Sequence, residues 1–382
     1  MGVMVLGFAV GAAAAPFLPS DDAQVLEHLP GGNAVQKRQL RSLQAAAAHA
    51  PKDLASATTL AAAHIRASRV EGDPRYLGYA QAALAPWWKD PAAPTPVLLL
   101  RATILQSIHQ FIPAIADLDR VLTRDPKHGQ ALLTRATVLT VIGRYREARS
   151  DCDRLEGIAP EIYRVVCLAG IDSVTGNAGL AYETVRRTLR AGARIDSAGR
   201  AWGETLLGEF AQRRGDPAAD GHFRAVLASE RDLYALGAYS DWLLDQGRAA
   251  EVVTLLAGET RIDPLLLRLA LAERALKRPE AATSIDTLRA RFAASWARGD
   301  TSHGRENARF ELALDDHPRQ ALVLALDNWK VQREPADLRI LAEAAAATGD
   351  AAALSIVKRW LAETGIEYPR VAALVAGKGP GK

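Results

Sequence analysis

The chain has 382 residues, 49% of them hydrophobic, which is enough apolar sequence for one large core or for several ordinary domains. Its net charge is +3, from 47 Lys and Arg against 44 Asp and Glu, and the two signs are mixed along the chain. No block of basic residues is present, which argues against nucleic-acid binding. Abundant Ala and scarce β-branched runs favour helices, because Ala has the highest intrinsic helix propensity.

Residues 1–15 predict a secretory signal peptide. The segment from Val3 to Ala15 is apolar and ends in four alanines, like the hydrophobic region and cleavage zone of such a signal. The basic region that usually precedes it is missing, since the first Lys or Arg is Lys37. An uncleaved anchor is the alternative, but the run is shorter than the ~20 residues that span a bilayer. We expect a periplasmic or secreted protein with no membrane span after cleavage, and an extended lead-in over 16–34.

Two segments of the chain match at a fixed displacement of 34 residues. The run LLLRATIL, which begins at Leu98, aligns with LLTRATVL, which begins at Leu132. The match continues through Ile108/Ile142, Phe111/Tyr145, Ala114/Ala148, Asp117/Asp151, Asp119/Asp153, Arg120/Arg154 and Pro126/Pro160. One offset held through so many positions indicates an internal repeat, with its best copies at 95–128 and 129–161.

Each copy has the features of a helical hairpin. Alanines such as Ala136 and Ala148 would let two antiparallel helices approach closely, and Gly143 lies where the chain would turn between them. Pro160 would end the second helix, because proline cannot donate to the preceding turn. A single hairpin cannot bury its own apolar face, so its stability must come from stacking on neighbouring hairpins.

The period and the residue types resemble the tetratricopeptide repeat, in an exported bacterial protein. Counted from Gly129, the chain has small residues, Gly, Tyr and Pro at the characteristic positions of that repeat, but Leu132 replaces an aromatic residue and Arg135 a leucine. The resemblance implies an all-α fold, an α-solenoid of stacked antiparallel helical hairpins. The solenoid is expected over 35–256, with a degenerate helical continuation over 257–376 and a disordered tail over 377–382.

Beyond residue 263 the repeat phase drifts, but amphipathic patterns still predict helices. Six are expected, at Leu265–Leu276, Pro279–Ala297, Arg305–Leu314, Pro318–Gln332, Ala336–Thr348 and Ala351–Glu363. Arg213-Arg214-Gly215-Asp216 resembles an adhesion tripeptide, but its position favours a turn between helices, with Gly as a C-cap and Asp as the next N-cap.

The chain has two cysteines, Cys152 and Cys167, too few for a thiol-based zinc site. The first would lie on the second helix of one hairpin and the other on the first helix of the next, so a disulfide is sterically plausible in an exported protein. The alternative is a pair of buried thiols that pack as small apolar residues.

The resemblance also implies a concave groove lined by the first helix of each hairpin, where a protein or peptide partner would bind. The predicted groove residues are Leu99, Thr103, Gln106, Gln130, Leu133, Thr137, Thr140, Tyr163 and Val166. The set carries no charge and would suit an extended peptide or a partner helix. The alternative is that this face packs against another helix of the same chain.

No catalytic motif, metal site or cofactor motif is recognisable, so we expect a non-catalytic scaffold for protein–protein interaction in the periplasm or envelope. Two alternatives are a protein that binds cell-wall glycan or acts on the cell wall, and a structural component that self-assembles as a homo-oligomer. The cell-wall alternative needs clustered carboxylates, whereas Asp117, Asp119, Asp151 and Asp153 are expected to be dispersed and solvated.

Overall fold

The computed structural model describes residue 21 and residues 34–191, 195–299 and 303–377, and within them every regular element is helical. The predicted signal peptide, almost all of the lead-in and residues 378–382 of the predicted tail lie outside this part. The helices are α1 Ala34–His49, α2 Leu54–Glu71, α3 Arg75–Ala83, α4 Thr95–Ser107, α5 Phe111–Arg124, α6 Gly129–Val141, α7 Tyr145–Asp153, α8 Glu161–Asp172, α9 Ala178–Ala191, α10 Ser197–Arg214, α11 Ala218–Ser229, α12 Leu233–Asp245, α13 Ala249–Leu255, α14 Asp263–Ala275, α15 Glu280–Ala297, α16 Gly304–Ala313, α17 Pro318–Val331, α18 Pro335–Thr348, α19 Ala351–Thr364 and α20 Pro369–Val375, with a short 3-10 helix at Ala85–Trp87.

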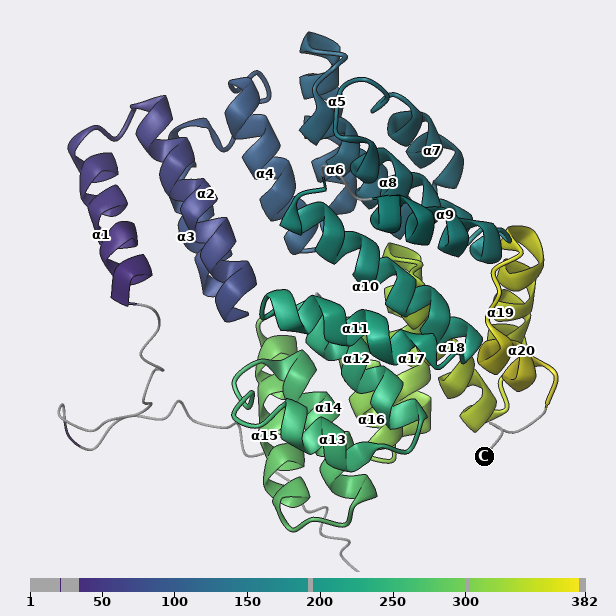
Figure 1. Cartoon of the computed structure of the whole chain (residues 1–382). Coiled ribbons are helices and arrows are strands. Elements are labelled where there is room, and N and C mark those ends of the chain that lie inside the picture. The colour runs from purple at the N-terminus through teal and green to yellow at the C-terminus, as the bar shows by residue number, and fades with distance from the viewer. Residues whose placement is uncertain (1–20, 22–33, 192–194, 300–302, 378–382) are drawn as a thin grey trace, which may run out of the picture.

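Consecutive helices pack as antiparallel hairpins, most extensively α10 with α11, α16 with α17, α2 with α3 and α4 with α5 (Figure 1). Even-numbered helices also contact one another in an unbroken row from α2 to α20. This arrangement of stacked hairpins confirms the predicted all-α solenoid of tetratricopeptide type. All six helices predicted after residue 263 are present, from α14 to α19, while α20 was not predicted.

The alanines and the glycine of the repeat occupy the positions predicted for them, at the contact between helices and in the turn. Ala102, Ala114, Ala136 and Ala148 are almost completely buried where the two helices of a hairpin meet. Gly143, in the turn between α6 and α7, has a φ of +80°, a region that glycine adopts without steric cost. Its counterpart one repeat earlier is His109, which adopts a φ of 58° despite its side chain and stacks on Phe111 with ring centroids 5.5 Å apart.

Two of the aspartates that were expected to be solvated are buried. Asp117 and Asp151 are 2% and 1% exposed, and each accepts two hydrogen bonds from the arginine that replaces a leucine of the repeat. That expectation was wrong for these two because the arginine partner on the preceding helix makes burial of the carboxylate possible. Asp119 and Asp153 are exposed.

Cys152 on α7 and Cys167 on α8 form a disulfide, with their Cα atoms 5.7 Å apart. Both residues belong to the hydrophobic core of the N-terminal half. The bond therefore joins the second helix of one hairpin to the first helix of the next.

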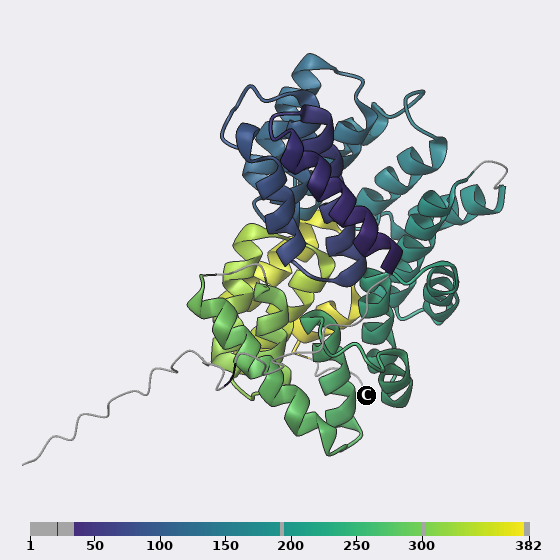
Figure 2. The same cartoon turned by 90° about the vertical axis from the view of Figure 1, so that its left-hand side faces the viewer.

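The solenoid curls until segments that are far apart in sequence touch. The backbone N–H of Arg333 donates to the carbonyl of Val141 at 2.7 Å, and the Trp360 ring packs 6.1 Å from that of Tyr145. On another side of the molecule, Arg231 Nη1 donates to the carbonyl of Val70 at 3.1 Å. Helix α20 accordingly contacts α10, and Figure 1 shows the yellow α19 and α20 just below the end of α9. In Figure 2 the yellow helices lie in the middle of the molecule, between green helices on one side and teal helices on the other. We call the contact of Val141 and Tyr145 with Arg333 and Trp360 the seam.

No helix within the described ranges is long and apolar enough to cross a membrane.

Candidate functional site

A cavity of about 660 Å³ lies at the centre of the curled solenoid. Its walls come mainly from the even-numbered helices α2, α4, α6, α10, α12, α14, α16 and α18. Ser173 and Val174 just after α8, Leu77 on α3, and Tyr145 and Tyr368 beside the seam complete the lining. The concave face of the solenoid is thus rolled around an internal space. A cavity of this size falls in the range of sites that hold small molecules or short segments of chain.

Buried ion pairs line the C-terminal side of the cavity. The Asp241 carboxylate on α12 lies between two arginines, with Arg268 Nη2 at 2.7 Å from Oδ2 and Arg309 against Oδ1. Burial opposes the charge of Asp241, but the two guanidinium groups outweigh it and lower its pKa. This carboxylate is therefore held as an anion that ties three inner helices together.

Arg305 on α16 is the centre of a second network. Its guanidinium contacts Glu306 at 3.3 Å and Glu334 at 2.9 Å. Burial favours the neutral form of Glu306, but the charge of Arg305 prevails and lowers its pKa to about 2. In contrast, burial raises the pKa of the neighbouring Asp337 to about 6, although Asn328 and Gln332 each donate to its Oδ1 at 2.9 Å.

A third network joins the last helices to the middle of the chain. Arg339 Nη1 and Nη2 donate to the two oxygens of Asp245 at 2.6 and 2.7 Å, and Arg370 donates to the same carboxylate at 2.7 Å. Arg339 also pairs with Glu343 at 2.8 Å. These contacts span 94 and 125 residues, so they hold the curled form of the solenoid.

Arg213, in the last turn of α10, differs from these arginines. Its side chain lines the cavity and is only 9% exposed, yet no carboxylate of the described residues lies within ion-pair distance of it. Its one hydrogen bond, to the carbonyl of Ser173, is long at 3.5 Å, and it stacks 5.2 Å from the Phe210 ring centroid. Burial accordingly lowers its pKa, against the opposing charge of Glu209.

Glu209, one turn before Arg213, is engaged elsewhere. Its Oε1 accepts a hydrogen bond from the Tyr234 hydroxyl. Tyr234 lines the cavity, and 57% of its surface is accessible. Burial raises the pKa of Glu209, and the Glu209 charge followed by burial raises the pKa of Tyr234 well above its usual value.

The predicted groove residues are placed differently from one another. Thr140 lines the cavity, while Leu99, Thr103, Gln106, Leu133 and Thr137 lie half-buried on α4 and α6, and Gln130 is exposed at the start of α6. Tyr163 is half-buried, and its hydroxyl is bound by the carboxylate of Asp196. Val166 is completely buried in the core, so it cannot contact a partner, and its prediction as a groove residue was wrong. An apolar residue on the inner helix of a repeat can equally face the neighbouring helix, which is the case here.

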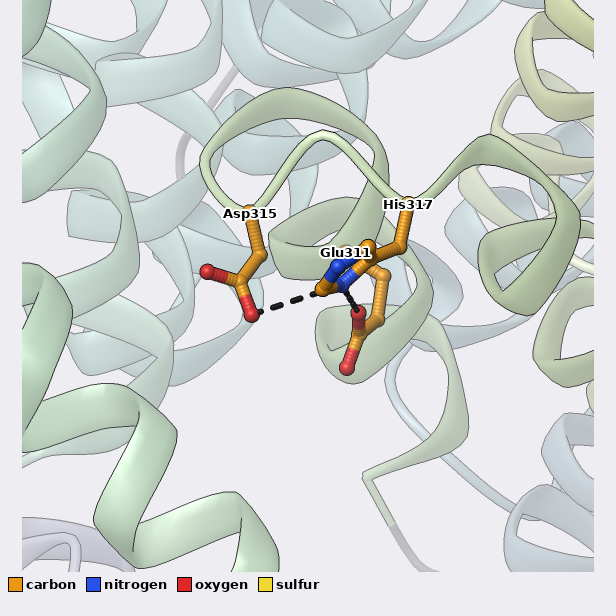
Figure 3. A group of neighbouring side chains, drawn as sticks. All are labelled: Glu311, Asp315 and His317. Atoms are coloured by element: carbon orange, nitrogen blue, oxygen red, sulfur yellow. Dashed lines mark hydrogen bonds and ion pairs between the residues drawn. The ribbon is translucent and has the colours of Figure 1, made fainter. Parts of the chain in front are cut away.

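A three-residue cluster at the turn between α16 and α17 has the ligand types of a metal site (Figure 3). His317 Nδ1 lies 2.9 Å from Glu311 Oε2 and 3.5 Å from Asp315 Oδ2. Arg289 already pairs with Asp315, and 61% of the His317 side chain is exposed. The contacts fit a turn held by ion pairs, and we assign them that role.

The cavity and its arginines were missed from the sequence. The sequence placed Arg213 only in a turn motif. Gly215 is confirmed as the C-cap of α10, with a φ of 72°. The N-cap of α11 is Pro217 and not Asp216, although Asp216 accepts a hydrogen bond from the Ala218 N–H at 2.9 Å. One signal in the sequence could have identified Arg213. It lies on the apolar face of its helix, and no acidic residue follows it at the 16-residue spacing that separates Asp117 from Arg101.

No family model matches the chain, and no curated protein matches it. A tetratricopeptide repeat protein from Parabacteroides merdae shares 17% identity and a TM-score of 0.41, over 63% of this chain and 88% of that one. The APC/C hetero-tetramer Cut9–Hcn1 shares 15% identity and a TM-score of 0.41 over 85% of this chain, which spans about half, 52%, of the matched chain. The human IFIT1 dimer with m7Gppp-AAAA shares 12% identity and a TM-score of 0.40, over 90% of this chain and 86% of that one. The fold assignment therefore rests on the hairpins and repeat positions of the chain itself.

Proposed function

We propose that the chain is a non-catalytic scaffold of the cell envelope, periplasmic or secreted, that binds a peptide or helix of a partner protein. A solenoid of tetratricopeptide type in general presents an extended concave surface suited to protein–protein interaction. The location is proposed from the apolar, alanine-ended segment at residues 1–15.

The observation that carries the proposal is a stripe of accessible side chains on two neighbouring inner helices. Leu99, Thr103 and Gln106 recur at helical spacing on α4, and Leu133, Thr137 and Thr140 occupy the equivalent positions on α6. These residues are half-buried, so a partner could still contact them, and Thr140 connects the stripe to the cavity.

The stripe has a neutral, amphipathic chemistry. The hydroxyls of Thr103 and Thr137 donate to carbonyls of their own helices at 2.9 and 3.0 Å, so their methyl groups and the two leucines offer apolar contacts. Gln106 adds an amide that could bond a peptide backbone. An extended segment or the apolar side of a helix would fit such a surface.

The test is site-specific photo-crosslinking in the envelope fraction, with the photoreactive residue at position 137 and, as a matched control, at position 123. Thr123 is exposed on the outer helix α5 and bonds its own helix in the same way as Thr137. Adducts with another protein from position 137, absent from position 123, would support the proposal. Adducts with a second copy of this chain alone would support the self-assembling alternative instead, and equal labelling at both positions would exclude the stripe as the binding surface.

A further inference from the structure

Arg213 is a buried guanidinium that forms no ion pair with the described residues. Such a group is unfavourable unless a bound anion supplies the missing negative charge. Four other cavity arginines, Arg268, Arg305, Arg309 and Arg339, each pair with a carboxylate. Arg213 lies against the same space and has no such partner in the described part of the chain, while 91% of its surface is covered. Taking a charge out of water has a large desolvation cost, which is offset only when a partner charge and hydrogen bonds are present.

Two tyrosine hydroxyls near the seam are free to bind a ligand. Tyr145 and Tyr368 line the cavity together with Arg213, and within the described ranges neither hydroxyl accepts or donates a hydrogen bond. Arg333 also lines the cavity, and its guanidinium stacks 5.4 Å from the Trp360 ring centroid. It forms no ion pair with any residue that the structure describes. Two arginines and two tyrosines with unpaired polar groups therefore line the same cavity beside the seam.

Charge balance selects the ligand class. Arg213 and Arg333 contribute two positive charges, and Glu209 contributes one negative charge when it is ionised, so the surroundings favour an anion with a single charge. A carboxylate meets this requirement and can accept two parallel N–H bonds from one guanidinium. A phosphate monoester carries about −1.5 to −2 at neutral pH and would leave negative charge beside Glu209.

The rest of the wall suits an organic body. Val174, Leu206 and Ile340 line the same cavity, and its volume of about 660 Å³ holds a small molecule and not a folded partner. We propose that the cavity binds a small organic monocarboxylate, with the carboxylate paired to Arg213 and supported by the hydroxyls of Tyr145 and Tyr368. The residues assigned to the carboxylate do not belong to the stripe on α4 and α6, which shares only Thr140 with the cavity wall, and neither proposal depends on the other.

The experiment is calorimetric titration of the full chain with hexanoate, beside hexanamide, inorganic phosphate and a short peptide with a free C-terminus. Hexanoate should bind, and hexanamide and phosphate at least ten-fold more weakly. Equal binding of hexanamide would show that the carboxylate is not recognised, and tighter binding of phosphate would overturn the assigned ligand class. If the peptide binds and hexanoate does not, the site recognises the C-terminus of a partner protein, and the assignment to a small molecule is overturned.

Variants separate a binding role of Arg213 from a structural one. R213M should bind hexanoate at least ten-fold more weakly while the thermal midpoint of the free protein stays the same or rises, because an unpaired buried charge is removed. R268M, which breaks the pair with Asp241, should lower the midpoint. The exposed R359M should alter neither property. A midpoint of R213M that falls as far as that of R268M, or unchanged hexanoate binding, would overturn the proposal.

Tyr145→Phe provides a second measurement that does not depend on how well R213M folds. It removes one hydroxyl and keeps the ring that packs on Trp360. We expect several-fold weaker hexanoate binding with an unchanged thermal midpoint, and unchanged binding would contradict the proposed geometry.

Discussion

Arg101 and Asp117 form a buried bidentate ion pair, and the same pair recurs 34 residues later between Arg135 and Asp151. In the first, Nε and Nη2 donate to the two carboxylate oxygens at 2.6 and 2.7 Å, and in the second both distances are 2.7 Å. Arg101 Nη1 also donates to the carbonyl of Trp88 at 2.5 Å, which fixes the turn before α4. The arginine that departs from the usual repeat thus has a structural role within its own hairpin.

We expect R101L to destabilise the protein by up to about 3–5 kcal/mol, because it removes the buried bidentate partner of Asp117 and leaves that carboxylate only the more exposed Arg120, at 2.8 Å. R101L together with D117L should recover most of that loss, since an apolar pair can replace a buried ion pair at little cost. Urea denaturation measures both changes. R144L is the control, because the pair with Glu147 is largely exposed and should contribute no more than about 1 kcal/mol. A double variant as unstable as R101L would contradict the role assigned to the pair.

Gly143→Ala tests the seam. A Cβ at this position would lie 2.8 Å from Cη2 of Trp360 and would also require a left-handed backbone, whose cost is about 1–2 kcal/mol for other residues. Gly247→Ala is matched, since its φ is +71° and nothing lies within 4 Å of the added atom. We expect Gly143→Ala to lower the stability more than Gly247→Ala does, by denaturant unfolding. Equal losses would mean that the seam does not form as described.

Ala148→Leu tests the phase of the repeat. The Ala148 side chain is fully buried where α7 meets α6, so three more carbons must displace the neighbouring helix. Overpacking of this kind costs about 1–3 kcal/mol and should appear as a lower thermal midpoint. Ala92→Leu, in the exposed loop before α4, is the control that should leave the midpoint unchanged. A midpoint of Ala148→Leu equal to that of the parent would place the helix crossing elsewhere.

The acid stability should depend on Glu306. Its pKa is about 2 in the folded protein, where Arg305 overcomes the effect of burial, against an ordinary value of 4.5. A lowered pKa means that the unfolded chain binds the proton more tightly, so the stability from this group is complete above pH 4.5 and is lost as the pH falls towards 2. Glu306→Gln should therefore lose less stability than the parent between pH 5 and pH 3, measured by denaturant unfolding at each pH. Glu363→Gln, at an exposed position of α19, should follow the parent. An acid loss in Glu306→Gln as steep as in the parent would assign the effect to other carboxylates.

The local features were accessible from the sequence because they repeat or have a helical period. The 34-residue offset places Ala136, Gly143 and Ala148 correctly, and periodicity predicts α14 to α19 even where the repeat is weak. The burial of Asp117 and Asp151 could have been anticipated from the same offset, since Arg101 and Arg135 share it. The prediction that these carboxylates are solvated considered each one without its arginine partner.

The seam and the cavity were not predictable in this way. The hydrogen bond from Arg333 to Val141 joins residues that share no local pattern, and its existence depends on the small rotation between successive hairpins summed over the chain. The role of Arg213 follows from that closure, because Tyr145 and Tyr368 approach it only when the two halves of the chain meet. Val166 shows the same limit on a smaller scale, since one helical position decides between groove and core.

The seam also limits how this protein can change in length during evolution. An open solenoid can gain or lose a repeat at little cost, because each hairpin contacts only its neighbours. Here an added 34-residue hairpin between α7 and α16 would shift Arg333 and Trp360 away from Val141 and Tyr145. A hairpin added between α12 and α18 would also move Arg339 and Arg370 out of reach of Asp245. The number of hairpins is therefore fixed by the circumference of the closed turn. Repeat proteins usually diversify by duplicating a repeat, and a duplication here would break the seam.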